Sequence, residues 1–438
     1  MSQTWTNWAG NQTAAGITVV RPRSTAEIAA VVKDARDTGK RVKPVGAGHS
    51  FTSIAQPDDI QLVLDRHANV VGLDAASGLI TVAAGMPLHR LNRVLADAGL
   101  SLTNLGDIDS QTIAGAISTG THGTGAAFGG LATQVRALRI VLADGSIADC
   151  DSDNRMELFN AARVGLGALG VISTVTLQAE PAFALRAVEG PMPLDETLKQ
   201  FDALADTNDH FEFYWFPHTA VALTKRNART SLDELAPLPR WREWMSDEFL
   251  SNTVYGAVVD VGRRAPAAIR PLNRLSARAL GSRTFTDQSH KVFTSPRRVR
   301  FVEMEYAVPR AAIVDIVREL RSTIDVAGWR IPFPIEVRVA AADDIPLSTA
   351  SGRASAYLAV HMPTRTDYSG YFRAVERIAS EVGGRPHWGK LHFLDAAALR
   401  ERYPRFDEFV ALRDKYDPTG VFRNAYLDRV LGIAPGLN

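Results

Sequence analysis

The sequence predicts a two-domain protein of the α+β class, and three observations lead to this prediction. The chain has 438 residues, which is more than one domain usually holds. Residues 17–45 have the pattern of a strand, a helix and a second strand. After about residue 180 the composition shifts, and strands and amphipathic helices follow in mixed order with few signals for parallel crossovers.

The first predicted elements form a β–α–β unit. Residues 17–22 (ITVVRP) and 41–45 (RVKPV) predict strands. Between them, Ser24 and Glu27 have the spacing of a capping box, in which each side chain satisfies a backbone N–H of the other residue. Apolar residues at helical spacing follow until Gly39 ends the helix. The unit leads into the loop 46–50.

The remaining elements follow from periodicity and turn residues. In the first part we expect strands at 61–65, 79–84 and 171–177, helices from Pro87 and over 157–164, and a hairpin over 138–148 that turns at Asp144 and Gly145. In the second part we expect helices after Pro309 and near Tyr368, strands at 211–216, 301–307, 335–339 and 356–361, and an ordered tail over 422–432.

Composition and charge exclude several classes of protein. The hydrophobic fraction of 46% and the charged fraction of 22% exclude intrinsic disorder. A net charge of +1 offers no basic field for nucleic acid or anionic lipid, so no nucleic-acid partner is expected. The single cysteine excludes an internal disulfide, a cysteine-based zinc site and an iron–sulfur cluster, and we expect no metal.

The N-terminus (MSQTWTNWAG) lacks the pattern of a secretory signal, and no run of 18 apolar residues predicts a transmembrane segment. The expected location is cytoplasmic, and peripheral membrane association stays open.

A short glycine pattern at residues 165–170 (GLGALG) matches the dinucleotide fingerprint G-x-G-x-x-G. That fingerprint needs a strand before the glycines and a helix after them, so that the helix N-terminus meets the pyrophosphate. Here a predicted helix precedes and a predicted strand follows. We therefore interpret the segment as a turn that packs a helix against a strand, and we disfavour an NAD-dependent dehydrogenase.

Two longer glycine-rich segments carry more information. They are residues 44–51 (PVGAGHSF) and 104–125 (NLGDIDSQTIAGAISTGTHGTG). Glycines allow backbone N–H groups to approach a ligand closely, and successive N–H groups form concave anion sites. Neither segment has the Gly-Lys-Ser/Thr ending of a P-loop. Two such segments favour a dinucleotide that is bound in an extended form.

These segments and others resemble the vanillyl-alcohol-oxidase-type FAD proteins, specifically the branch of sugar-1,4-lactone and alditol oxidases. The matching motifs are VGAGHSF (45–51), NLGDI (104–108), TIAGAISTGTHGTG (112–125), GALGVIST (167–174), IEVR (335–338) and RPHWGK (385–390). The resemblance covers the whole chain and is strongest over 10–180 and 385–432. It implies an FAD-binding domain over 1–180, completed by 405–438, and an α+β substrate domain over 181–404.

The resemblance assigns His49 as the residue bonded covalently to the flavin 8α-methyl group. Without the resemblance, the same residue reads as a histidine that forms a hydrogen bond in a loop. Cys150 lies in neither glycine-rich segment, which argues against a second covalent bond to the flavin. The other implied cofactor residues are Pro44, Val45, Gly46, Ala47, Gly48, Ser50, Gly106, Asp107, Thr112, Gly115, Ser118, Thr119, Gly120, Thr121, His122 and Val171.

The substrate side is expected from the second part of the chain. Glu336 and Arg338 are two apart on a predicted strand and therefore share a face. Spacing alone favours a surface ion pair, whereas the resemblance places a Glu-x-Arg pair against the substrate. The resemblance also assigns Lys390 to the reduced flavin and His361 to the substrate. The aromatic strand 211–216 we assign to the core rather than to sugar stacking.

Two positions depart from the family pattern or affect the acceptor. Asp107 stands where the family usually has serine, and Gly106 stands at a small-residue position associated with dioxygen access. The choice between oxidase and dehydrogenase therefore stays open.

The resemblance implies FAD-dependent oxidation of a sugar 1,4-lactone (L-gulono-, L-galactono- or D-arabinono-1,4-lactone) by hydride transfer to flavin N5. The flavin would be reoxidised by dioxygen or another acceptor. An alditol such as xylitol or sorbitol is the alternative substrate. The alternative of another class is a flavin- or sugar-binding protein without turnover, and the presence of Glu336, Arg338 and Lys390 counts against it.

Overall fold

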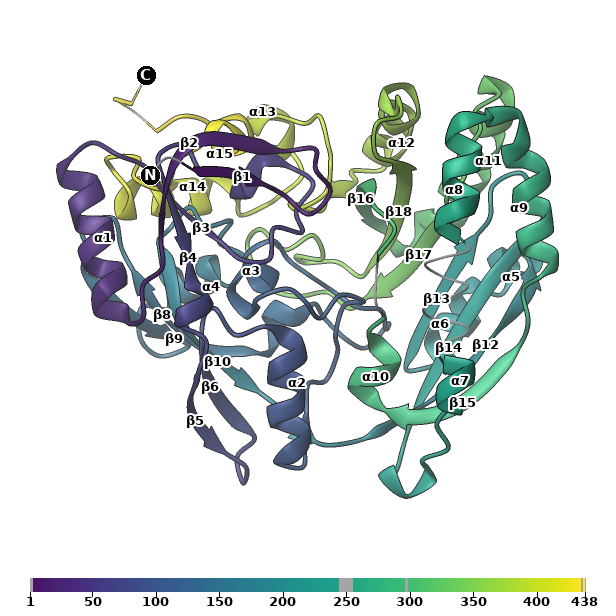
Figure 1. Cartoon of the computed structure of the whole chain (residues 1–438), viewed down its shortest axis with the longest axis horizontal. Coiled ribbons are helices and arrows are strands. Elements are labelled where there is room, and N and C mark those ends of the chain that lie inside the picture. Colours follow the sequence, from purple (N-terminus) through teal and green to yellow (C-terminus); the bar gives the residue numbers. More distant parts are fainter. Residues whose placement is uncertain (1–2, 244–254, 296–297, 435, 438) are drawn as a thin grey trace.

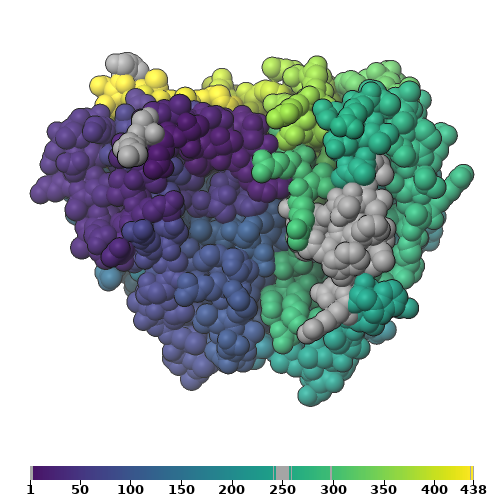
Figure 2. Space-filling view, viewed as in Figure 1, coloured from purple at the N-terminus to yellow at the C-terminus, as the bar shows by residue number. Residues whose placement is uncertain are grey.

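The computed structural model describes residues 3–243, 255–295, 298–434 and 436–437, and Figure 1 shows how their elements are arranged. The N-terminal elements (purple to blue) and the C-terminal helices (yellow) form a first lobe. The middle of the chain (teal to green) forms a second lobe beside it. Figure 2 shows the surfaces of the two lobes meeting along a seam in the middle of the molecule.

The first lobe begins with a sheet that has four strands in the described residues, in the order β1-β2-β4-β3. They are β1 (Gln3–Thr6), β2 (Thr13–Val20), β3 (Val42–Val45) and β4 (Ile60–Val63). Helix α1 (Thr25–Asp37) connects β2 to β3, as predicted. However, β4 lies between them and pairs in parallel with both. The loop 46–50 therefore leaves from an edge strand of this sheet.

The start of α1 confirms half of the predicted capping box. The Ser24 side chain accepts a hydrogen bond from the Glu27 amide at 3.2 Å. The Glu27 carboxylate extends one residue further toward the N-terminus than a capping box requires. It therefore accepts from the Arg23 amide at 2.7 Å and not from that of Ser24. Gly39 follows the helix with a φ of +67°, a conformation that favours glycine.

A second sheet of the first lobe is antiparallel, in the order β5-β6-β10-β8-β9. Its strands are β5 (Val70–Asp74), β6 (Leu79–Ala83), β8 (Val135–Val141), β9 (Ile147–Asp151) and β10 (Val171–Gln178). The β8–β9 hairpin turns at Asp144 and Gly145, as predicted. Around it lie helices α2 (Leu88–Asp97), α3 (Ile113–Ser118) and α4 (Met156–Ala162) and strands β7 (Leu100–Ser101) and β11 (Glu180–Pro181).

The segment 165–170 follows α4 and precedes β10, so the order of elements agrees with its interpretation as a turn. A Cβ atom at Gly170 would lie 2.5 Å from Ile140 Cγ2 and 2.6 Å from the Val141 carbonyl oxygen. Glycine at this position therefore allows the turn to pack directly against β8.

The second lobe is built on an antiparallel sheet with eight strands in the described residues, in the order β15-β12-β14-β13-β17-β18-β16-β19. They are β12 (Ala184–Pro193), β13 (His210–Trp215), β14 (Val221–Thr230), β15 (Arg283–Gln288), β16 (Phe301–Pro309), β17 (Ile335–Ala340), β18 (Ser355–Pro363) and β19 (Arg385–Pro386). The four strands predicted here are all present and lie side by side in the sheet as β13, β17, β18 and β16.

The two faces of this sheet differ in chemistry, because successive side chains of a strand point to opposite faces. One face is apolar and packs in a single core under helices α5 (Leu194–Lys199), α6 (Phe201–Thr207), α11 (Ile313–Ala327) and α12 (Ser369–Glu381). The other face carries polar side chains from the same four strands: Glu212, Tyr214, Glu303, Glu305, Glu336, Arg338 and His361. The lobe also contains α7 (Arg240–Glu243), α8 (Tyr255–Arg264), α9 (Ile269–Arg278) and α10 (Ser289–Phe293).

The C-terminal helices α13 (Ala396–Arg400), α14 (Phe406–Tyr416) and α15 (Ala425–Leu431) return to the core of the first lobe. The Val42 amide donates to the Val421 carbonyl at 2.8 Å, and the buried Lys43 ammonium donates to the Phe422 carbonyl at 2.5 Å. The buried Asn424 amide group donates to the carbonyls of Ser53, Ile54 and Gln56 at 3.0–3.1 Å. None of the described helices is long and apolar enough to cross a bilayer.

Asn424 is also the N-cap of α15, where its Oδ1 accepts from the Leu427 amide at 3.0 Å. Replacing Asn424 by alanine removes the cap and leaves three carbonyls without their donor, which should destabilise the fold by about 2–4 kcal/mol. Urea unfolding measures this change. The control is Ser24→Ala, which removes only the exposed cap of α1 and should cost about 0.5–1 kcal/mol. Equal losses in the two variants would contradict the proposed tie between tail and loop.

Candidate active site

Two adjoining cavities form the candidate site: one lies within the first lobe, and the other lies where the two lobes meet. The first, called the glycine-lined cavity, has a volume of about 310 Å³ and lies between the loop 44–50, the residues around α3 and the turn before β10. Eleven of the predicted cofactor residues line it: Pro44, Val45, Gly46, Ala47, Gly48, His49, Ser50, Thr112, Gly115, Ser118 and Thr119. The segment 165–170, rejected as a fingerprint, also contributes Leu166, Gly167 and Gly170 to the wall.

The other predicted cofactor residues lie elsewhere. Gly106, Asp107, Thr121 and His122 line the second cavity. Gly120 and Val171 line neither cavity. Gly120 has a φ of +79° in the turn after α3, and Val171 is fully buried at the start of β10.

The glycine-lined cavity has the features that a dinucleotide requires. A Cβ atom at Gly46 would lie 2.3 Å from Thr112 Oγ1, so only glycine lets the two glycine-rich segments come this close. Gly48 has a φ of +71°, which turns the backbone before His49. Backbone N–H groups and the hydroxyls of Ser50 and Thr119 are suitable donors for a pyrophosphate. The residues present therefore fit FAD.

His49 is held in a defined orientation on the wall of this cavity. Its Nε2 lies 2.9 Å from Ser110 Oγ, and its ring stacks on Trp8 with 5.3 Å between the ring centroids. Burial, assisted by the nearby Lys390 ammonium, lowers the pKa of His49 to about 4. The imidazole is therefore neutral at physiological pH, as a nucleophilic ring nitrogen must be.

The second cavity, called the charged cavity, has a volume of about 170 Å³. The first lobe contributes Gly106, Asp107, Gln111 and His122, and the polar face of the large sheet contributes most of the remaining wall. Gln111 lines both cavities, so a ligand in the first is adjacent to a ligand in the second. All four predicted catalytic residues, Glu336, Arg338, His361 and Lys390, line the charged cavity.

The Arg338 guanidinium is the centre of the charged cavity. Its Nε donates to Glu212 Oε2 at 2.9 Å, its Nη2 lies 2.6 Å from Asp107 Oδ2, and it also forms an ion pair with Glu336. All of these side chains are largely buried, so the cation and the carboxylates depend on one another. The pair of Glu336 and Arg338 is therefore a buried constellation and not a surface ion pair.

The pKa of Glu336 is raised, whereas that of Glu212 is lowered. Burial is the main cause of the raised pKa, with help from the neighbouring charges of Asp107 and Glu212, while Arg338 acts in the opposite direction. Tyr214 Oη lies 2.9 Å from Glu336 Oε1 and orients that carboxylate. A carboxylate with a raised pKa is a stronger base than an ordinary one.

Lys390 and His361 meet at a second buried carboxylate, Glu303. Lys390 forms an ion pair with Glu303, and His361 Nε2 lies 3.5 Å from the same side chain. The loop that carries Lys390 is bound to the His49 loop, because the Phe51 amide donates to the Gly389 carbonyl at 2.7 Å and Thr52 Oγ1 donates to the Trp388 carbonyl at 3.1 Å. The two signature motifs thus form one structural unit.

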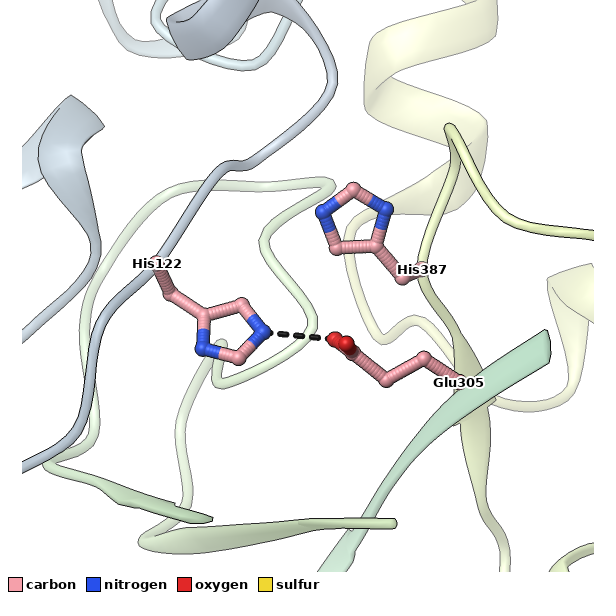
Figure 3. Close-up of side chains that lie close together, drawn as sticks. All are labelled: His122, Glu305 and His387. Carbon is pink, nitrogen blue, oxygen red and sulfur yellow. Dashed lines mark hydrogen bonds and ion pairs between the residues drawn. The ribbon is translucent and has the colours of Figure 1, made fainter. Parts of the chain in front are cut away.

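A third buried group, drawn in Figure 3, consists of His122, Glu305 and His387. His122 Nε2 lies 2.6 Å from Glu305 Oε1, and His122 Nδ1 lies 2.8 Å from the Gly123 carbonyl. His387 Nδ1 accepts from the Gly389 amide at 3.1 Å, and burial lowers the pKa of His387 to about 4. A neutral His387 therefore carries its proton on Nε2.

Several residues of the site were missed by the sequence analysis: Ser110, Gln111, Glu212, Tyr214, Glu303, Glu305 and His387. The aromatic strand illustrates the reason. Phe211 and Phe213 are core residues as predicted, but Glu212 and Tyr214 lie on the opposite face of the strand, where Tyr214 lines the charged cavity and Glu212 pairs with Arg338. A partial signal was present in the predicted strands, since Glu303 and Glu305 occupy alternate positions of 301–307 and Glu212 lies between two phenylalanines of 211–216.

The fold and the two adjoining cavities define an FAD-binding oxidoreductase. The sequence model of an FAD binding domain matches residues 17–151, and that of D-arabinono-1,4-lactone oxidase matches residues 175–430. The chain belongs to the D-arabinono-1,4-lactone oxidase family, as the motifs predicted.

Relatives align over nearly the whole length. The L-gulono-1,4-lactone dehydrogenase of Mycobacterium tuberculosis (strain ATCC 25618 / H37Rv) is 44% identical over 99% of this chain and 100% of its own. The L-gulonolactone oxidase of Bos taurus is 35% identical over 97% of both chains, and an alditol oxidase of a Streptomyces species is 31% identical over 98% and 100%.

Among solved structures, cholesterol oxidase from B. sterolicum has a TM-score of 0.85 at 16% identity, covering 98% of this chain and 97% of that one. A solvent-stable cholesterol oxidase has a TM-score of 0.81 at 19% identity, covering 99% and 98%. This likeness shows the fold, and the predicted two-domain FAD-binding fold of the vanillyl-alcohol-oxidase type is confirmed.

Proposed function

We propose that the protein oxidises a hydroxyl group of a sugar 1,4-lactone in the charged cavity, with FAD in the glycine-lined cavity. The observation that carries the proposal is the position of the Glu336 and Arg338 pair on the wall of a cavity that shares Gln111 with the glycine-lined cavity. The relatives named as L-gulono-1,4-lactone dehydrogenase and L-gulonolactone oxidase support the substrate class.

In this proposal the loops 44–50 and 112–119 hold the cofactor, and residues 1–180 with 405–438 form its domain. FAD supplies the acceptor for the two electrons that leave the substrate carbon. Arg338 donates hydrogen bonds that orient the substrate hydroxyl, and Glu336 takes its proton at a carboxylate oxygen. Lys390, anchored by Glu303, supplies a fixed positive charge toward the cofactor side.

The excess of carboxylates around the charged cavity favours a neutral substrate over an anionic one. The wall carries the carboxylates Asp107, Glu303, Glu305 and Glu336 against the cations Arg338 and Lys390, and Glu212 pairs with Arg338 beside it. An anionic aldonate, the product of lactone hydrolysis, would be repelled there, whereas a neutral lactone would not. Asp107, in place of the usual serine, strengthens this discrimination. A neutral alditol meets the same requirement, and the alditol oxidase relative makes it the second candidate substrate.

The proposal includes a covalent 8α-histidyl bond between FAD and His49. Because Ser110 holds Nε2, Nδ1 is the ring nitrogen without a hydrogen-bond partner in the described residues. The final electron acceptor is dioxygen or another oxidant, since the relatives include both an oxidase and a dehydrogenase. The single, buried Cys150 fits a reducing cytoplasmic location.

The substrate class is tested by anaerobic reduction of the flavin, followed as loss of its visible absorbance. L-gulono-1,4-lactone should bleach the flavin at least about tenfold faster than L-gulonate at equal concentration, because a tenfold ratio needs only about 1.4 kcal/mol of charge repulsion. Asp107→Asn should reduce this ratio. The panel includes D-arabinono-1,4-lactone and xylitol. If no lactone bleaches the flavin, or if the aldonate is faster, the proposal is wrong. Readmission of oxygen separates an oxidase, which regains colour, from a dehydrogenase.

The role of Glu336 is tested by Glu336→Gln, which keeps the size and the hydrogen bond from Tyr214 but removes the base. The variant should bind FAD normally and lose about 10²–10⁴-fold in kcat with the lactone. The matched control is Glu189→Gln on β12, a carboxylate that is paired with Arg283 outside both cavities. Steady-state kinetics that show equal losses for both variants would refute a catalytic role.

The covalent bond is tested by acid precipitation of the purified protein. Flavin fluorescence should remain in the pellet of the natural protein and should move to the supernatant for His49→Ala. Ser110→Ala should slow the attachment without removing His49. A colourless pellet from the natural protein would refute the covalent bond to His49 but would not contradict the binding of FAD.

A further inference from the structure

A third cavity lies in the second lobe, away from the charged cavity. It has a volume of about 660 Å³ and lies between the end of β13 and helices α9 and α11, which appear together at the right of Figure 1. Trp215 lines this cavity, whereas its neighbour Tyr214 lines the charged cavity, so the two cavities lie on opposite faces of the same strand. Nothing in the proposed oxidation uses it.

Its wall carries a row of arginines, and it is therefore called the arginine cavity. Arg270, Arg274 and Arg278 stand at i, i+4 and i+8 on α9 and so share one face of the helix. None of the three forms an ion pair with any residue that the structure describes. Like charges at this spacing destabilise a helix, and a cation in the first turn, such as Arg270, opposes the helix dipole.

Two buried donors on the same wall lack acceptors. Arg270 Nε and His218 Nδ1 are both shielded from solvent and have no hydrogen-bond partner in the described residues. His218 Nε2 accepts from the Ile331 amide at 3.2 Å, and burial together with the arginines lowers the pKa of His218 to about 4. The ring is therefore neutral with its proton on Nδ1. Buried donors without acceptors are costly, and a bound acceptor would satisfy them.

The remaining charges do not neutralise the row. Arg321 of α11 also lines the cavity and is paired with Asp195 at 3.1 Å. Asp325 is the one carboxylate on the wall among the described residues. The cavity therefore presents excess positive charge and several N–H donors in fork geometry, an arrangement that matches the oxygens of a phosphate group.

We propose that the arginine cavity is a binding site for a phosphate group that carries at least two negative charges. Arg274 and Arg278 would contact the phosphate oxygens, and Arg270 and His218 would donate from the inner wall. The apolar side chains of Trp215 and Ile324 also line the cavity and would contact an organic part of the ligand. The same chemistry is offered by a free phosphorylated molecule and by a lipid headgroup.

The site is tested with FAD-loaded protein, so that the cofactor loops are occupied. Titration calorimetry with inorganic pyrophosphate at low salt should show one binding site per chain. The double variant Arg274→Gln/Arg278→Gln should weaken this binding at least tenfold and leave lactone oxidation unchanged. A matched control, Arg318→Gln/Arg377→Gln, removes two exposed arginines from α11 and α12 outside the cavity and should bind pyrophosphate as the natural protein does.

Flotation with vesicles identifies the source of the phosphate. Binding to vesicles with phosphatidic acid, but not to pure phosphatidylcholine, and competition by pyrophosphate would assign a lipid headgroup. Pyrophosphate binding without vesicle binding would assign a free phosphorylated molecule. The proposal is overturned if neither probe binds, or if the Arg274→Gln/Arg278→Gln variant binds both probes as well as the control variant does.

Discussion

The candidate active site depends on the ion pairs that the buried guanidinium of Arg338 forms with three carboxylates. The partners of Arg338 come from three separate segments: Asp107 from the first lobe, Glu212 from β13, and Glu336 from its own strand. Removing one charge from such a group would leave the others buried without compensation, so the lobes and the strands are held in one arrangement. A nearby backbone bond, from the Gly125 amide to the Val339 carbonyl at 2.9 Å, closes the same contact between the lobes. The site exists only when both lobes are in place.

The cofactor side depends on a similar meeting of distant segments. The His49 loop leaves an edge strand of the first sheet, and the Lys390 loop follows β19 of the large sheet, yet the two are joined by one backbone hydrogen bond and one from the Thr52 side chain. A Cβ atom at Gly389 would lie 3.1 Å from Ser50 Oγ, so glycine at this position allows the close approach. The tail that contains Asn424 packs in the core of the first lobe and is hydrogen-bonded to the segment that follows the His49 loop. The proposed tether and the proposed counter-charge for the reduced cofactor are thus positioned by one unit.

The parts of the fold with strong local periodicity could be predicted from the sequence. Alternation located β13, β16, β17 and β18, and the two glycine-rich segments located 13 of the 28 residues that line the glycine-lined cavity. The insertion of β4 between β2 and β3 could not be predicted, because strand order depends on contacts between distant segments. Glu303 and Glu305 were missed for a related reason. A charged residue on alternate positions of a strand reads equally as a solvated face, and only the closing of the first lobe over the sheet buries them.

The most direct test of the account is a crystal structure of the FAD-loaded protein with a sugar 1,4-lactone and the flavin kept reduced. We expect FAD along the glycine-lined cavity and the lactone in the charged cavity, with one ring hydroxyl within hydrogen-bond distance of both Glu336 and Arg338 and its carbon facing the flavin. A lactone bound outside the charged cavity, or with its hydroxyls turned away from Glu336 and Arg338, would contradict the account.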